Sequence, residues 1–226
     1  MTRLFVQEFA PHPVFAPAFA LLSRPVARLP GGPWNKSVFG DTPHAPDAGP
    51  PAFIFAVGGD ERPCLALDAD WDAAVMAPLA LAFQSLTGAA RFMREHAGGA
   101  IAVVLPSPAL VLSGASSPSS VLLRSLLGMA EALRAELTDT EVGVTIVFFD
   151  PAAADPRDLA LRLERSIAQN PMYSLSSDFT ASQINGAYDT ICQALDRTTE
   201  GPPLPDIGPM AAVYLPHLIR PPGSGC

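Results

Sequence analysis

The middle of the chain alternates short apolar runs with longer amphipathic segments, and this alternation limits the available folds more than any other feature. The apolar runs have the length and composition of buried strands, and they lie at residues 52–57, 101–105 and 142–149. The amphipathic segments predict helices at 70–96, 117–138, 156–169 and 180–196. Strands that alternate with helices predict an α/β fold: a mostly parallel sheet with helices on both faces and right-handed crossovers.

Composition divides the chain into three zones within one expected domain, because a chain of 226 residues can bury a single core. Residues 1–51 are rich in proline and contain one predicted strand, at residues 4–9. Residues 52–197 carry the alternating pattern. Residues 198–226 form a second proline-rich zone with a short predicted strand at 211–214.

Charge and hydropathy exclude several classes of partner. The net charge is −8 and the basic residues are scattered, so we expect neither nucleic acid nor an anionic membrane as a partner. No uninterrupted apolar run reaches the length of about 18 residues that a membrane span needs. The apolar stretch at 13–23 is interrupted by prolines and preceded by Glu8, which is atypical of a signal peptide.

The cysteines and histidines indicate neither a disulfide framework nor a metal site. The three cysteines are widely spaced, and no two histidines have the i,i+4 spacing of metal ligands. A reducing, cytoplasmic location fits this cysteine usage best.

One segment carries a family likeness. Residues 98–137 read GGAIAVVLPSPALVLSGASSPSSVLLRSLLGMAEALRAEL and resemble the short-chain dehydrogenase/reductase family from its fifth strand through its fifth helix. The run IFAVGG at 54–59 lies where that family has an Asn-Asn-Ala-Gly turn, and VGVTIVFF at 142–149 resembles its sixth strand. Trp71 matches a tryptophan that often begins a helix in the family. The likeness covers residues 52–150 and implies a Rossmann-like sheet.

The positions that the resemblance assigns to catalysis are occupied by other residue types. The family's serine falls on Pro106, its tyrosine on Ser119, its lysine on Leu123 and its helix-kinking asparagine on Pro78. The only lysine in the chain is Lys36. No tyrosine is followed four residues later by a lysine; the tyrosines are Tyr173, Tyr188 and Tyr214.

These changes remove the proton chemistry of the family. A tyrosine with a pKa of about 10 works near neutral pH only if a cation lowers that pKa. Leu123 has no charge, and the hydroxyl of Ser119 is far less acidic than a phenol. We therefore expect no catalytic residues at these positions.

The cofactor half of the family pattern is also altered. The family's glycine-rich turn, whose N–H groups hold the pyrophosphate, would follow the first strand, where this chain has Ala10-Pro11-His12-Pro13. Proline has no N–H to donate. Only 51 residues precede Ala52, fewer than the family usually has, so we expect the loss of at least one βα unit in a truncated N-terminal part. No cofactor is expected.

The two long helices at 70–96 and 117–138 have apolar stripes that are broader than one face. In the resembled family the corresponding helices form the four-helix interface of the dimer. Burial inside a single subunit would explain the same pattern, but we favour an interface. The candidate interface residues are Leu79, Phe83, Leu86, Leu122, Leu126, Gly128, Met129, Ala132 and Leu133.

Three functions remain open after these observations. The favoured hypothesis is a catalytically inactive, structural or regulatory subunit, either a homodimer or a heteromer with an active paralogue of the short-chain dehydrogenase family. The second is an atypical NAD(P)-dependent oxidoreductase with relocated groups, using Tyr173 or Tyr188 with an arginine. The third is a protein that binds a small molecule or an acyl group.

Overall fold

The computed structural model describes residues 4–29, 50–58, 71–95, 98–106, 118–170 and 173–174. The chain divides into two compact units, residues 1–176 and residues 177–226, and every described residue belongs to the first. The predicted helix at 180–196 and the predicted strand at 211–214 lie outside the described residues.

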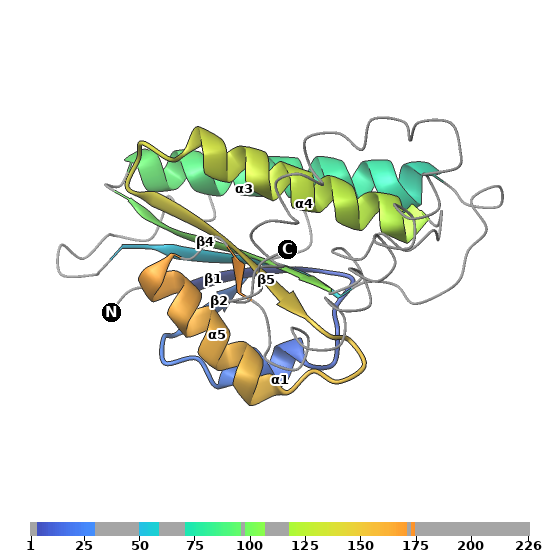
Figure 1. Ribbon diagram of the computed structural model, residues 1–226, viewed down its shortest axis with the longest axis horizontal. Coiled ribbons are helices and arrows are strands. Elements are labelled where there is room, and N and C mark those ends of the chain that lie inside the picture. Colours follow the sequence, from blue (N-terminus) through green and yellow to red (C-terminus); the bar gives the residue numbers. More distant parts are fainter. Residues whose placement is uncertain are drawn as a thin grey trace, which may run out of the picture. The chain divides into compact units, whose positions relative to one another are not determined.

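The described residues form a six-stranded sheet in which every neighbouring pair is parallel (Figure 1). The strand order is β2-β1-β3-β4-β5-β6. The strands are β1 (Leu4–Phe9), β2 (Val26–Arg28), β3 (Ala52–Val57), β4 (Gly99–Pro106), β5 (Val142–Phe149) and β6 (Tyr173–Ser174). This confirms the predicted α/β class with a parallel sheet.

Helices cover both faces of the sheet, as predicted. The helical segments are α1 (Phe15–Ala20), η1 (Asp72–Met76), α3 (Ala77–Glu95), α4 (Pro118–Glu136) and α5 (Pro156–Gln169). Figure 1 shows α3 and α4 on one face, with α1 and α5 on the other.

Alternate residues of each strand enter two separate cores. Phe53, Phe55 and Ile101 point toward α3 and α4. Ile54 and Val104 point toward α1 and α5. Because β3 and β5 are buried along their whole length, both their faces must be apolar, and this explains the uninterrupted apolar runs in the sequence.

The first turn of the long helix is widened. The N–H of Ala77 donates to the carbonyl of Asp72, which is a π-type bond. Pro78 follows at once and cannot donate an N–H to the residue four positions earlier, and its ring would crowd that carbonyl. The π turn of η1 relieves this conflict without ending the helix.

The same helix ends at Glu95, as the Gly-Gly pair at 98 and 99 predicted. Gly98 has φ of 109° and donates its N–H to the carbonyl of Met93. A Cβ at this position would lie 2.7 Å from the carbonyl oxygen of Glu141, so both conformation and space require glycine.

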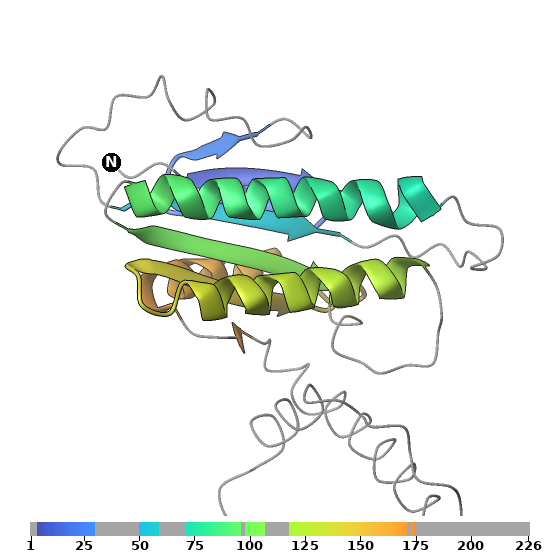
Figure 2. The ribbon, with the colours of Figure 1, turned by 90° about the horizontal axis from the view of Figure 1, so that it is seen from above.

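One crossover differs from the expectation that all would be right-handed. The strand order continues in one direction from β3 to β6, yet α5 lies on the face opposite α3 and α4. The β5–α5–β6 connection is therefore left-handed. In Figure 2, α5 is partly hidden behind α4, because it lies on the far face of the sheet in that view. Arg162 of α5 secures it by donating to the carbonyls of Phe148 in β5 and Ser174 in β6, at 2.6 and 3.4 Å.

The N-terminal zone contributes more structure than the single strand predicted for it. That strand, β1, is confirmed, but α1 and β2 were not predicted. β2 has three residues and α1 has six, with Pro17 inside it, so neither shows a clear periodicity. Within the described residues, β2 is the only strand that lies beyond β1 at this side of the sheet.

One helical stretch among the described residues, 72–95, is long and apolar enough to cross a membrane by length and composition alone. Its apolar character has a local explanation, because Leu86 and Met93 fill the core against the sheet.

Candidate functional site

The carboxyl ends of the strands are the first place to look for a site, because open parallel sheets bind ligands there, at the point where the strand order reverses. In this sheet the chain leaves β1 for β2 on one side and returns to β3 on the other. The reversal therefore lies between β1 and β3. The residues that follow these strands are Ala10 and Gly58, and the ends of β4 and β5 bring Pro106 and Phe149 to the same edge.

The residues at the family's catalytic positions lie at or near this edge. Pro106 is buried and is the last residue of β4, paired with Phe149 of β5. Leu123 lies in α4 with an exposed fraction of 6% and packs in the core beneath α3 and α4. Ser119 belongs to the first turn of α4, and its side chain lies outside the described part. Pro78 is buried where the helix widens.

A histidine that sequence reasoning passed over lies at the centre of the edge. The ring of His12 lies 5.9 Å from the ring of Phe15 and 5.2 Å from the ring of Phe149, measured between centroids. Its Nδ1 accepts a hydrogen bond from the N–H of Val14 at 3.3 Å, and its carbonyl accepts from the N–H of Phe15 at 3.0 Å. His12 thus accepts hydrogen bonds from both backbone N–H groups at the beginning of α1, through its ring and through its carbonyl.

The turn that carries His12 is held against the end of β3. The N–H of Gly58 donates to the carbonyls of Phe9 and Ala10, at 3.1 and 2.9 Å. A Cβ at position 58 would lie 2.0 Å from the carbonyl oxygen of Ala10 and 3.0 Å from the nitrogen of His12. Only glycine permits this approach. Ala10 itself has φ of 48°, a left-handed conformation that is uncommon for alanine.

The helix layer of α3 and α4 divides the candidate interface residues into two groups. Four of them are buried within this subunit, with exposed fractions of 7% or less: Leu86, Leu122, Leu126 and Leu133. These four cannot meet a partner directly, so the monomer core explains their place in the stripe. The others retain surface: Leu79, Gly128 and Met129 are half-buried, and Phe83 and Ala132 are exposed.

Exposed apolar side chains gather in the first half of this layer. Met76 is 58% exposed, Phe83 56%, and Trp71 and Val121 40% each. The exposed positions of the long helix between 73 and 83 are all apolar: Ala73, Met76, Ala77, Ala80 and Phe83. Beyond them the exposed positions become polar or charged, with Gln84, Arg91, Arg94 and Glu95.

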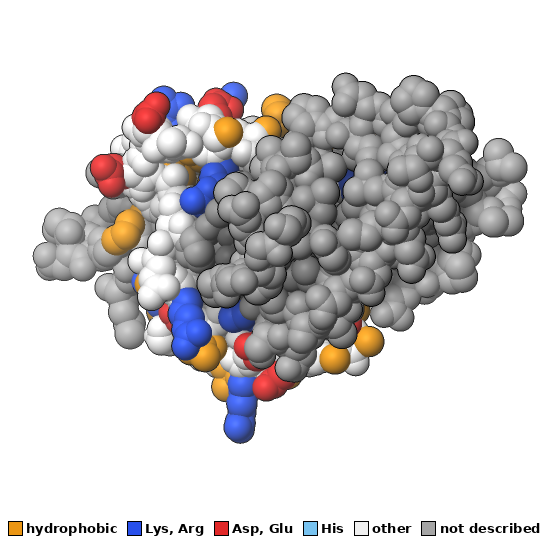
Figure 3. Space-filling model, in the orientation of Figure 1, with side chains coloured by type: hydrophobic (Ala, Val, Ile, Leu, Met, Phe, Trp, Pro, Cys, Tyr) orange, Lys and Arg blue, Asp and Glu red, His pale blue; other side chains and the backbone are white. Residues whose placement is uncertain are grey.

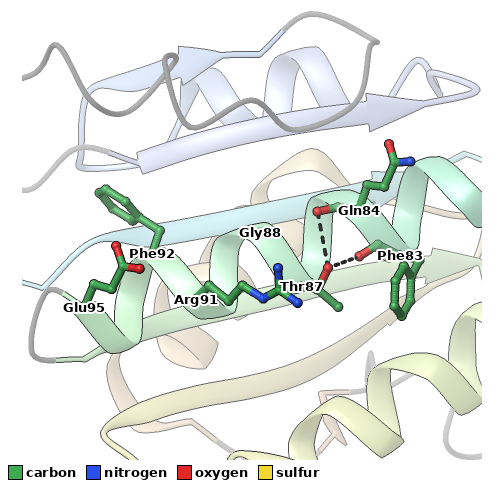
Figure 4. A pocket seen from close by; sticks show the side chains of 7 residues that line it. All are labelled: Phe83, Gln84, Thr87, Gly88, Arg91, Phe92 and Glu95. Atoms are coloured by element: carbon green, nitrogen blue, oxygen red, sulfur yellow. Dashed lines mark hydrogen bonds between the residues drawn. The ribbon is translucent and has the colours of Figure 1, made fainter.

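A pocket of about 500 Å³ lies along the outer side of α3 where this change occurs (Figure 4). Its described lining is Phe83, Gln84, Thr87, Gly88, Arg91, Phe92 and Glu95. Phe83 and Phe92 project to opposite sides of the helix, and Gly88 lies between them without a side chain. The hydroxyl of Thr87 donates back to the carbonyl of Phe83 at 2.6 Å. The pocket follows one helix, away from the carboxyl edge of the sheet.

Charges of both signs are interspersed on the visible face. Among the described residues that Figure 3 displays, arginine side chains and acidic side chains both reach the surface.

No family model and no curated protein matches the sequence. Solved structures do match. A short-chain dehydrogenase from Burkholderia cenocepacia J2315, crystallised with NADP, superposes with a TM-score of 0.60 at 20% identity and covers 85% of this chain and 95% of that one. The apo form of LigO from Sphingobium sp. strain SYK-6 gives a TM-score of 0.63 at 15% identity and covers 98% of each chain.

A third match, to a protein from Novosphingobium aromaticivorans assigned to the short-chain dehydrogenases, has a TM-score of 0.52 at 17% identity. It covers 75% of this chain and 65% of that one, which is slightly less than two thirds. This chain has the short-chain dehydrogenase fold. At identities of 20% or less the likeness concerns the fold, and substrates and activities do not follow from it.

The fold implies a dinucleotide, whose pyrophosphate would have to fit the residues at the carboxyl edge of the sheet. A pyrophosphate between β1 and α1 needs free backbone N–H groups and room for close approach. Pro11 and Pro13 have no N–H, and the N–H groups of Val14 and Phe15 already donate to His12. With α1 only six residues long, the residues present do not fit this group.

Proposed function

We propose that the chain is a catalytically inactive member of the short-chain dehydrogenase fold that acts as a structural or regulatory subunit. It associates through the layer of α3 and α4, with a second copy of itself or with an active paralogue. One observation carries the proposal: the layer retains a well-packed core and an exposed apolar outer stretch, while the catalytic positions beside it hold Pro106 and the buried Leu123.

The loss of catalysis follows from chemistry at position 123. The family uses a lysine at this position to lower the pKa of the tyrosine one turn earlier in the helix. Leu123 is 6% exposed and points into the core, so it places a methyl-bearing chain where that cation would act. General acid–base help worth about 10²–10⁴ in rate is lost with the pair.

Association follows from the surface that remains. Exposed apolar side chains scattered singly are ordinary, but Trp71, Met76, Phe83 and Val121 belong to adjacent segments of one layer, since η1 contacts α4. A contiguous apolar patch with a charged border is typical of an interaction surface. Arg91, Arg94 and Glu95 form such a border along the second half of α3.

Small residues on α4 allow a partner helix to approach closely. A Cβ added at Gly128 would meet nothing within 4 Å, so this position faces open space in the subunit. Ala132, one turn further, is exposed. Helices approach most closely where side chains are small, and interaxial distances of about 8–10 Å depend on them.

Co-expression tests the proposal directly. Two copies of the chain carrying different tags are produced together, and in parallel one tagged copy is produced with a catalytically intact short-chain dehydrogenase from the same genome. We expect stoichiometric co-purification in one of the two pairings, and no oxidation of NADH or NADPH by the isolated chain with carbonyl substrates. A monomer in both pairings, or nicotinamide-dependent turnover by the isolated chain, would overturn the proposal.

A further inference from the structure

The turn between β1 and α1 fills the position that the fold normally offers to a dinucleotide. We propose that His12 closes this turn from the inside, so that the pyrophosphate position between β1 and β3 is unavailable in this chain. This closure goes beyond the proposed association and is independent of it, because a closed turn and an associating layer of α3 and α4 can each exist without the other.

Few backbone N–H groups of the turn are available to a phosphate. Of the six backbone nitrogens from Ala10 to Phe15, two belong to prolines and two donate to His12. A phosphate at a helix N-terminus is held by N–H groups that point at it and have no other partner. Here the side chain of His12 takes the role of the acceptor, and its carbonyl takes a second donor.

Aromatic rings fill the space around His12 at the carboxyl edge of the sheet. The ring of His12 contacts both Phe15 of α1 and Phe149 at the end of β5, and the rings of Phe15 and Phe149 are themselves 5.2 Å apart. Aromatic rings with centroids about 4.5–7 Å apart are in favourable contact. The three rings therefore form one cluster across the carboxyl edge, where a ligand would have to enter.

The backbone of the turn is held in place, so it cannot easily move away from the pyrophosphate position. Gly58 binds the carbonyls of Phe9 and Ala10 from the other side, and its Cα lies too close to Ala10 for any side chain. The positive φ of Ala10 is maintained by these bonds, since alanine adopts that conformation only where its surroundings impose it.

The test measures nucleotide binding and amide exchange on the whole chain. The protein is titrated with NADPH and with NADH by calorimetry, and hydrogen exchange is followed at Val14 and Phe15 with and without nucleotide. The dehydrogenase from Burkholderia cenocepacia, which was crystallised with NADP, is titrated under the same conditions as the positive control. We expect no saturable heat from this chain up to about 1 mM nucleotide.

The exchange of the two amides distinguishes nucleotide bound in the turn from nucleotide bound elsewhere. Saturable binding accompanied by slower exchange at Val14 and Phe15 would overturn the inference, because nucleotide would then occupy the turn. Saturable binding that leaves both amides unchanged would place the nucleotide elsewhere and would support a closed turn. Either result leaves the association experiments untouched, so failure here is distinguishable from failure of the proposed function.

Two variants test the role of the imidazole itself. His12→Ala removes the acceptor, and we expect the Val14 amide to exchange about tenfold faster, because the hydrogen bond that protects it is lost. His12→Asn restores a side-chain acceptor and should recover most of the protection. Unchanged exchange in His12→Ala would show that the ring does not hold the turn and would contradict the inference. If His12→Ala fails to fold, the wild-type titration still decides.

Discussion

The two helix layers that cover the sheet differ in the side chains that they expose on their outer surfaces. The layer of α1 and α5 is tied to its surroundings by polar links: Glu164 of α5 accepts from the N–H and hydroxyl of Ser23, and Arg162 reaches two strand carbonyls. The layer of α3 and α4 has a similar link, from Arg134 of α4 to the carbonyl of Val144, but its outer surface exposes Met76 and Phe83.

This difference between the outer surfaces indicates which of the two layers would bind a partner. Exposed leucines also occur on the other layer. Leu21, directly after α1, is 54% exposed, and Leu161 of α5 is 51% exposed with the exposed Arg157 and Arg165 one turn away on either side of it. On the long helix the exposed positions from 73 to 83 contain no charge at all. Association is therefore expected of one layer and not of the other.

The largest effect should come from the inner side of the α3 layer. Leu86→Ala removes a side chain with 0% exposure from the core, and we expect it to lower the free energy of unfolding by about 2–5 kcal/mol. Phe83→Ala, on the outer side of the same helix, should change the stability of the monomer by less than about 0.5 kcal/mol. Denaturant unfolding of both variants measures the contrast. Equal losses would mean that α3 has no distinct inner and outer sides.

The polar links of the other layer should come next in size. Arg162→Met keeps the length of the side chain but removes the bonds to Phe148 and Ser174, so we expect a loss of about 1.5–3 kcal/mol. The control is Arg165→Met, an exposed arginine on the same helix, which should be nearly neutral. Thermal and denaturant unfolding report both. A neutral Arg162→Met would show that the left-handed connection does not depend on this guanidinium.

A smaller effect of opposite sign is expected at Gly128. Gly128→Ala adds a methyl group in open space and removes a flexible residue from a helix interior, so the monomer should gain up to about 1 kcal/mol. The bulkier Gly128→Leu should still fold, yet it should weaken association if a partner helix approaches α4 here. Unfolding and sedimentation of the two variants together make the comparison. Association that is unaffected by leucine would move the interface away from α4.

The sequence was informative where one signal decided the structure. β3 and β5 were predicted to the residue because both faces of each strand are buried. The helix predicted at about 156–169 is α5, which Asp155 caps and Pro156 begins. In contrast, α1 and β2 are too short for a periodicity to develop, and residues 173–174 form a strand of only two residues.

The candidate site was less accessible from the sequence, for physical reasons. A broad apolar stripe does not distinguish core from interface, so Leu86 and Phe83 had equal standing until the sheet fixed which side of α3 is inside. His12 belongs to no motif. Its importance depends on Phe149, far away in the chain, and only the pairing of β1, β3, β4 and β5 brings the two to one edge.

Sedimentation velocity over a series of protein concentrations tests the central claim most directly, using the wild-type chain, Phe83→Asp and Leu161→Asp. Phe83 and Leu161 are similarly exposed, at 56% and 51%, but lie on opposite layers. For self-association through the layer of α3 and α4, we expect the wild type and Leu161→Asp to sediment as dimers and Phe83→Asp as a monomer. With a paralogue as partner, the same variants should divide in the same way when the two proteins are mixed. If the two variants sediment in the same way, association through the layer of α3 and α4 is contradicted.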